Sequence, residues 1–172
     1  VLLQSISEQD YQDYEAIVVD DASQDNSVSA VRSQFPNVKV ITLDKNQGPA
    51  VTRNAGIHKT RGSIIVGLDS DVVLMDKNIL TCIASKFLET PRLDCLALRI
   101  LNFYTHKDDV KTWWHPFSIE NNADSEFFTD YFSGTGYAFR RSVFEKAGYY
   151  PEDLFMHGEE NDLAFRILDS GF

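Results

Sequence analysis

Short runs of apolar, β-branched residues alternate with longer amphipathic stretches along this chain. The runs predict buried strands, because a strand covered on both faces reads as a continuous apolar segment. The stretches between them carry apolar residues three or four positions apart, which predicts helices. Strands that alternate with helices in this way indicate an α/β fold with a mostly parallel, twisted sheet flanked by helices. The predicted strands are 14–21, 38–43, 63–71 and 93–101.

The second half of the chain is less regular. We expect residues 111–122 to form a loop or short helix, and residues 132–141 to form a strand whose glycines let another group approach the backbone. A short helix over 142–148 and a final helix over 157–171 follow. The chain begins in what reads as the tail of an amphipathic helix and stops just past another helix. Residues 1–172 are therefore expected to be most of one domain, shortened at both ends.

Composition narrows the classes of partner. The chain has 172 residues, of which 43% are apolar, and a net charge of -10 from 16 basic and 26 acidic residues. The sequence has no cluster of lysine and arginine that could track a phosphate backbone, so nucleic acid is not expected as a partner. No apolar stretch is long enough to cross a bilayer. We expect a cytoplasmic protein. If it associates with the cytoplasmic face of a membrane, the attachment is expected to come only from segments outside this chain.

Two predicted strands end in acids, Asp20-Asp21 and Asp69-Ser70-Asp71. Ligands of open α/β sheets bind beyond the carboxyl ends of the strands, so both acid pairs could face one crevice. Paired carboxylates suit Mg²⁺ or Mn²⁺, and such ions usually share the phosphates of a substrate. An Asp-x-Asp turn alone is more often a cap or a surface turn. The second acid pair at another strand end favours the cation site.

A helix is expected to begin at Gly48-Pro49, because proline in the first turn loses no hydrogen bond. Its free N–H groups and dipole suit an anion. Lys45 lies just before it and Arg53 lies one turn in. A well-capped surface helix with a solvated arginine is the plainer alternative. Combined with the acids, the helix predicts a site for a nucleotide diphosphate.

The final predicted helix carries a candidate general base. Glu160 shares a helix face with Leu163, Ala164 and Ile167, which should pack inward, whereas Glu159 is expected to point elsewhere. Partial desolvation would raise the pKa of an inward carboxylate toward the range that a general base needs. The alternative is an acid that only complements the helix dipole.

Five segments in order resemble the family 2 glycosyltransferases, which have the GT-A fold. They are IVVDDASQDNS, NQGPAVTRNAG, RGSIIVGLDSDV, GTGYAFRRSVFEKAGYY and HGEENDLAFRILDSG. Together they cover nearly the whole chain, and five ordered motifs are a specific match. The family's opening strand would precede Val1. The chain also departs from the family at Glu159-Glu160, where the usual pair is Glu-Asp.

The resemblance implies inverting transfer of a sugar from a nucleotide-diphosphate sugar, with a UDP-sugar favoured, to a hydroxyl acceptor such as a growing glycan. Glu160 matches the position of the catalytic base. A divalent cation, Mn²⁺ or Mg²⁺, would be the cofactor. By the same pattern, Asp69 contacts the ribose or the metal and Asp71 is the direct metal ligand.

The resemblance also implies contacts to the nucleotide. Asp20 and Asp21 would approach the nucleobase and ribose, with Asp21 assigned to the base. Asn46 and Arg53 match the loop and helix that touch the nucleotide.

Three other functions are alternatives to sugar transfer for a chain of this fold class. A dinucleotide dehydrogenase needs a Gly-x-Gly-x-x-Gly turn after its first strand, and the sequence has none there. A sugar nucleotidylyltransferase needs a glycine-rich phosphate loop near its start. The Glu159-Glu160 motif argues against this function, but it stays open because the N-terminus is expected to be shortened. A non-catalytic nucleotide-sugar binding module stays open as an alternative, although such a module would be expected to have lost one of the acids.

Overall fold

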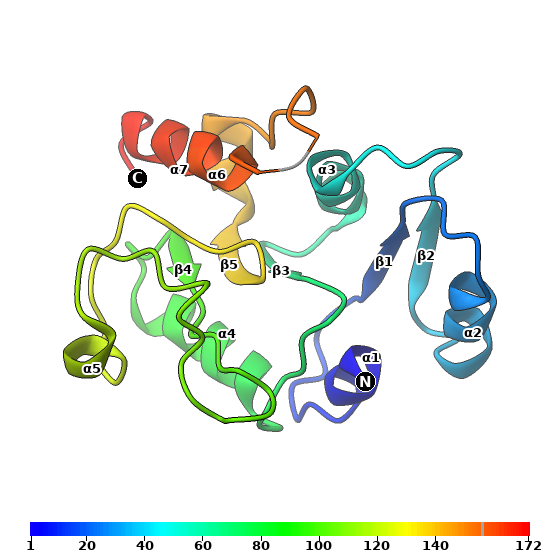
Figure 1. The fold of residues 1–172 in the computed structure, drawn as a ribbon, viewed down its shortest axis with the longest axis horizontal. Coiled ribbons are helices and arrows are strands. Elements are labelled where there is room, and N and C mark those ends of the chain that lie inside the picture. The colour runs from blue at the N-terminus through cyan, green and yellow to red at the C-terminus, as the bar shows by residue number, and fades with distance from the viewer. Residues whose placement is uncertain (156) are drawn as a thin grey trace.

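The computed structural model describes residues 1–155 and 157–172, and its strands and helices alternate through most of that range (Figure 1). The strands are β1 (Ile17–Asp20), β2 (Lys39–Thr42), β3 (Ile64–Leu68), β4 (Cys95–Ala97) and β5 (Gly136–Arg140). The helices are α1 (Leu2–Ser7), α2 (Ser27–Gln34), α3 (Pro49–Lys59), α4 (Ile79–Glu89), α5 (Ile119–Asn122), α6 (Arg141–Ala147) and α7 (Glu159–Asp169). Among these helices, none is both long enough and apolar enough to cross a membrane.

The strands form two sheets. β1 pairs in parallel with β2, and β5 lies between β3 and β4 and runs antiparallel to both. β3 and β4 therefore point the same way, and β5 is the strand that departs from the parallel arrangement. The α/β class agrees with the prediction from the apolar pattern.

Several predicted strands are shorter in the structure, because an apolar run can leave the sheet. The run over 93–101 pairs with β5 only over Cys95–Ala97. One further backbone hydrogen bond flanks each end of this pairing, from the Leu98 N–H to the Gly136 carbonyl and from the Arg140 N–H to the Asp94 carbonyl. Beyond it, Leu101 bridges to Asp108 in a separate turn. The expected strand over 132–141 begins only at Gly136, and Arg141 already opens α6.

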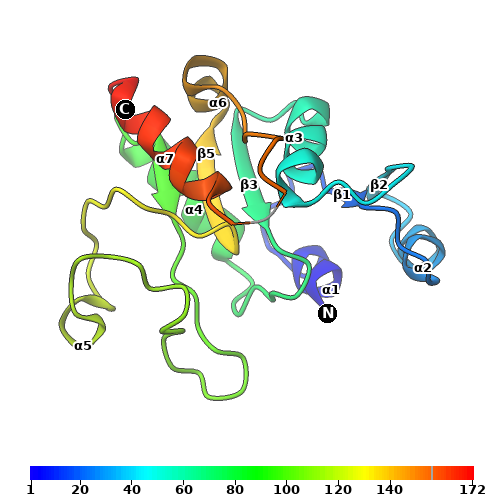
Figure 2. The same ribbon diagram turned by 45° about the horizontal axis from the view of Figure 1, so that its top comes forward.

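Helices cover both faces of the three-stranded sheet (Figures 1 and 2). On one face, Tyr137 and Phe139 of β5 pack in a cluster with residues of α3, α6 and α7. On the other face, Ala138 packs with Ile83 and Phe87 of α4. Successive strand residues point to opposite faces, so β5 contributes to both cores. This packing fixes the first turn of α7 beside α3.

Candidate active site

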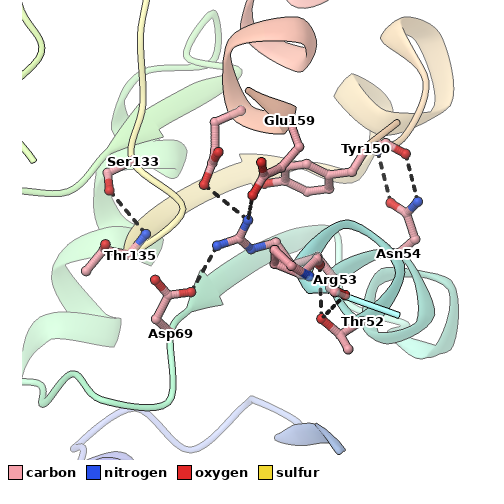
Figure 3. Close-up of polar contacts among 11 residues, drawn as sticks. Thr52, Arg53, Asn54, Asp69, Ser133, Thr135, Tyr150 and Glu159 are labelled. Atoms are coloured by element: carbon pink, nitrogen blue, oxygen red, sulfur yellow. Dashed lines mark hydrogen bonds and ion pairs between the residues drawn. The ribbon is translucent and has the colours of Figure 1, made fainter. Parts of the chain in front are cut away.

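Arg53 is the centre of the site, and it joins three elements (Figure 3). Its Nη2 lies 3.0 Å from Oδ1 of Asp69, which directly follows β3. Its Nη1 lies 3.1 Å from Oε1 of Glu159 and 3.1 Å from Oε1 of Glu160, the first two residues of α7. Three of the residues singled out in the sequence, Arg53, Asp69 and Glu160, therefore lie in one cluster. One guanidinium faces three carboxylates there.

The cluster is partly shielded from water. Side-chain exposure is 15% for Arg53 and 18% for Glu160, but 39% for Asp69. Burial works against the charge of Arg53, but Tyr150, Asp69 and Glu160 outweigh it, so the pKa of Arg53 lies above its ordinary value. Burial also raises the pKa of Glu160, and the neighbouring Glu159 adds to this while Arg53 opposes it. A raised carboxyl pKa suits a group that must accept a proton.

Glu159 was expected to point away from the interior, and that prediction was wrong. Its residue exposure is 3%, so it is more deeply buried than Glu160. Leu163, Ala164 and Ile167 are buried as predicted. The sequence did carry a signal for Glu159, because it lies four positions before Leu163 and so shares that side of the helix.

Gly134, two residues before β5, lies against the ion-pair cluster. A Cβ at this position would lie 2.2 Å from Nη2 of Arg53 and 2.3 Å from Oε1 of Glu160. A side chain here would force the tips of Arg53 and Glu160 to shift, so the backbone itself forms a wall of the ion-pair cluster. The predicted close approach to a glycine is therefore present, and the approaching group is the Arg53–Glu160 pair.

The acids after β1 have separate local roles. Asp21 accepts hydrogen bonds from the N–H groups of Gln47 and Gly48, both at 2.8 Å. Gly48 precedes α3, so the carboxylate of Asp21 is the anion at the start of this helix, where the helix dipole favours it. Asp20 accepts a weaker hydrogen bond from the Ser23 N–H at 3.2 Å. Asp21 thus fixes the loop that leads into the helix bearing Arg53.

Asp71 and Asn46 are both exposed, and among the described residues neither side chain forms a hydrogen bond or ion pair with the cluster. Asp71 lies in the turn after β3 with Asp69, and Asn46 lies in the loop before α3. Within the described ranges, no three His, Cys, Asp or Glu side chains are grouped to hold a metal ion. Two carboxylates on one turn nevertheless fit an ion such as Mg²⁺, which takes one or two protein carboxylates and completes its shell with water and phosphate.

The sequence profile described as Glycosyl transferase family 2 matches residues 1–148. The chain belongs to this family. The match covers α1 to α6 and includes Asp20, Asp21, Arg53, Asp69 and Asp71; α7 lies beyond it.

Two curated relatives have names from sugar transfer and polysaccharide synthesis. The chain is 28% identical over 189 residues to the O-antigen chain rhamnosyltransferase RfbN of Salmonella typhimurium. This alignment covers 99% of this chain and 57% of the relative. It is 48% identical over 58 residues to the succinoglycan biosynthesis protein ExoO of Rhizobium meliloti, covering 33% of this chain and 17% of that protein. The chain therefore spans from about a sixth to just over half of these relatives' lengths.

Solved structures confirm the GT-A fold. The mannosyltransferase PcManGT from Pyrobaculum calidifontis, solved with GDP-Man and Mn²⁺, superposes with a TM-score of 0.71 at 28% identity, over 99% of this chain and 48% of that one. TarS 1-349 of S. aureus, solved with UDP, gives a TM-score of 0.76 at 22% identity, over 98% of this chain and 50% of that one.

Proposed function

We propose that residues 1–172 belong to one catalytic domain that transfers a sugar from a nucleotide-diphosphate sugar to a hydroxyl acceptor, with inversion at the anomeric carbon. The observation that carries this proposal is the placement of Arg53 between Asp69 and Glu160. Asp69 belongs to the acidic turn that would face the donor's diphosphate, and Glu160 is the candidate base. The residue proposed for the donor side and the residue proposed for the acceptor side thus contact the same guanidinium.

The donor would lie along the ends of β1 and β3. Asp20 and Asp21 would contact the nucleobase and ribose, and Asn46 and Arg53 would contact the nucleotide. A uridine nucleotide is the preferred donor in this proposal, because a carboxylate can accept the imide N–H of uracil. Two similar proteins support a nucleotide-sugar donor: TarS is described with UDP-GlcNAc and PcManGT with GDP-Man.

Asp69 and Asp71 would hold Mn²⁺ or Mg²⁺. Their hard oxygen ligands suit either ion. A bound cation would neutralise the charge that develops on the diphosphate leaving group. Arg53 keeps its positive charge although it is partly buried, because its pKa lies above the ordinary value. It supplies a second positive group beside the same turn.

Glu160 would remove the proton from the acceptor hydroxyl. Its carboxylate has the raised pKa and the partial exposure that such a step needs. The acceptor oxygen would then attack the anomeric carbon from the face opposite the diphosphate, which inverts the configuration there. A growing glycan or polysaccharide is the proposed acceptor, because RfbN and ExoO carry names from O-antigen and succinoglycan synthesis.

The test is nucleotide release from a panel of sugar nucleotides, with and without Mn²⁺ and with and without a glycan acceptor. The proposal expects release that depends on Mn²⁺ and rises when acceptor is added. Tight binding of a sugar nucleotide with no release under any condition would instead identify a non-catalytic binding module.

A further inference from the structure

The Glu159 side chain is buried, and its two carboxylate oxygens differ in their hydrogen bonding. Its Oε1 pairs with Arg53, but its Oε2 has no hydrogen-bond partner in the part of the chain that the structure describes. The Glu159 side chain is only 4% exposed. Leaving a buried acceptor unpaired destabilises a fold, and the cost is larger when the group is charged. Such a group calls for an explanation beyond packing.

Arg53 is also incompletely paired with this residue. Its Nη1 is divided between Glu159 and Glu160 at 3.1 Å each, longer than the roughly 2.7–2.9 Å of a strong charge-assisted hydrogen bond. Its Nη2 is turned to Asp69 instead. A guanidinium and a carboxylate bind most strongly through two parallel hydrogen bonds. Glu159 and Arg53 already share one of these bonds, and each has the group that a second would need.

Asp69 is the partner best placed to give up Arg53. It is the most exposed of the three carboxylates, at 39%, and it lies on the acidic turn that would face the donor. If Asp69 turns to the donor's ribose, Nη2 of Arg53 loses its partner. The unpaired Oε2 of Glu159 belongs to a residue that Arg53 already touches through Nη1.

We propose that Glu159 is a positioning residue that takes Arg53 in a two-bond pair when donor is bound and thereby releases Glu160 to act as the base. This inference rests on the proposed transfer reaction. Its direction follows from burial: Glu159 is enclosed and has no access to an acceptor, whereas the Glu160 side chain is 18% exposed. The enclosed glutamate holds the cation, and the exposed one is free to take a proton.

The test compares five variants with the wild type for transfer rate, donor binding by calorimetry and melting temperature. Glu159→Gln replaces one acceptor oxygen with an N–H₂ group, so it cannot bind Arg53 through two acceptors. We expect transfer to fall by about tenfold or more while the Kd for UDP changes by less than about threefold. Glu159→Asp keeps both oxygens and should restore part of the rate. Glu145→Gln, at an exposed position of α6, is the charge-matched control and should behave as wild type.

Arg53→Lys supplies the double-mutant test. Lysine keeps the charge but lacks the planar fork. If Glu159 acts through Arg53, the Glu159→Gln/Arg53→Lys double variant should be no slower than Arg53→Lys alone. Additive losses, an unchanged rate in Glu159→Gln, or a parallel loss of donor binding and melting temperature would each overturn the inference. A wild type without transfer activity would instead refute the proposed function itself.

Discussion

Asn54 and Tyr150 are joined by two hydrogen bonds that tie α3 to the segment before α7. Oδ1 of Asn54 accepts the Tyr150 N–H at 2.9 Å, and its Nδ2 donates to the Tyr150 carbonyl at 2.9 Å. Asn54 is 3% exposed and is the neighbour of Arg53. The side chain therefore satisfies two backbone groups at the point where α3 and the approach to α7 meet.

Removal of this side chain should destabilise the fold. In Asn54→Ala, the buried N–H and carbonyl of Tyr150 both lose their partner, so we expect the free energy of unfolding to fall by about 2–4 kcal/mol. Urea unfolding measures the change. Asn121→Ala is the control, because Asn121 is exposed and bonds only to nearby Ser118, and about 0.5 kcal/mol or less is expected. Equal losses in the two variants would contradict the role given to Asn54.

Gly134 should not accept a side chain. In Gly134→Ala the new methyl would enter the space held by Arg53 and Glu160, so the ion pair must shift. We expect transfer to fall at least tenfold, on the scale of roughly a hundredfold that small displacements at a reacting centre can cost. The matched control is Gly56→Ala in α3, where the Cβ would lie 3.4 Å from the Val19 side chain and helix propensity improves. Full activity in Gly134→Ala would show that the cluster can move without loss.

The sequence predicted the elements better than their pairing. The start of α3 at Pro49 and the strand runs before Asp20 and Asp69 are local features, set by proline geometry and by continuous apolar stretches. The antiparallel direction of β5 was not readable, because direction depends on which strands become neighbours in space. The shortening of β4 has the same cause, since its length is set by its partner.

The candidate site was likewise predicted in its residues but not in all of its contacts. The residue types and order placed Asp69, Arg53 and Glu160 near one crevice, and the structure brings them into contact. The burial of Glu159 was missed because the inward face of the helix was assigned to Glu160, although Glu159 lies four positions before the buried Leu163. Arg53 also faces carboxylates rather than solvent. Its partner Glu159 lies 106 residues further along the chain, so no local sequence pattern could predict this contact.

Transfer should depend on pH through Glu160. Burial and Glu159 raise the pKa of this carboxyl above its ordinary value, and a base must be ionised to act. We therefore expect the rate to increase with pH through a pKa above the ordinary glutamate value of about 4.3. Glu160→Gln keeps the shape but cannot accept the proton, so transfer should fall by about 10² or more with donor binding near wild type. Rapid transfer by this variant would remove Glu160 from the role of base.

Asp71 should matter for binding rather than for folding. It is exposed in the turn after β3, so Asp71→Ala should change the melting temperature little. Without it, the diphosphate would face the remaining acids with less compensation. Calorimetry of UDP with and without Mn²⁺ should therefore show that the variant has lost the metal-dependent part of binding. Retained, Mn²⁺-dependent affinity would exclude Asp71 as a ligand.

The nucleotide base provides the last prediction. Asp21 lies at the carboxyl end of β1, and its two oxygens each accept one N–H from the loop before α3, so its position is fixed. A fixed carboxylate oxygen can accept a further hydrogen bond, and uracil offers a ring N–H where adenine has only an acceptor nitrogen. UDP should therefore raise the melting temperature more than ADP does, with thymidine diphosphate next.

GDP is the most informative competitor in this panel, because guanine also carries a ring N–H and PcManGT is described with GDP-Man. Asp21→Asn should weaken the preference for UDP, since an amide presents one donor to a loop that supplies only N–H groups. A larger shift with ADP than with UDP in the wild type would contradict the assignment of Asp21. A larger shift with GDP would keep the carboxylate contact and change the base.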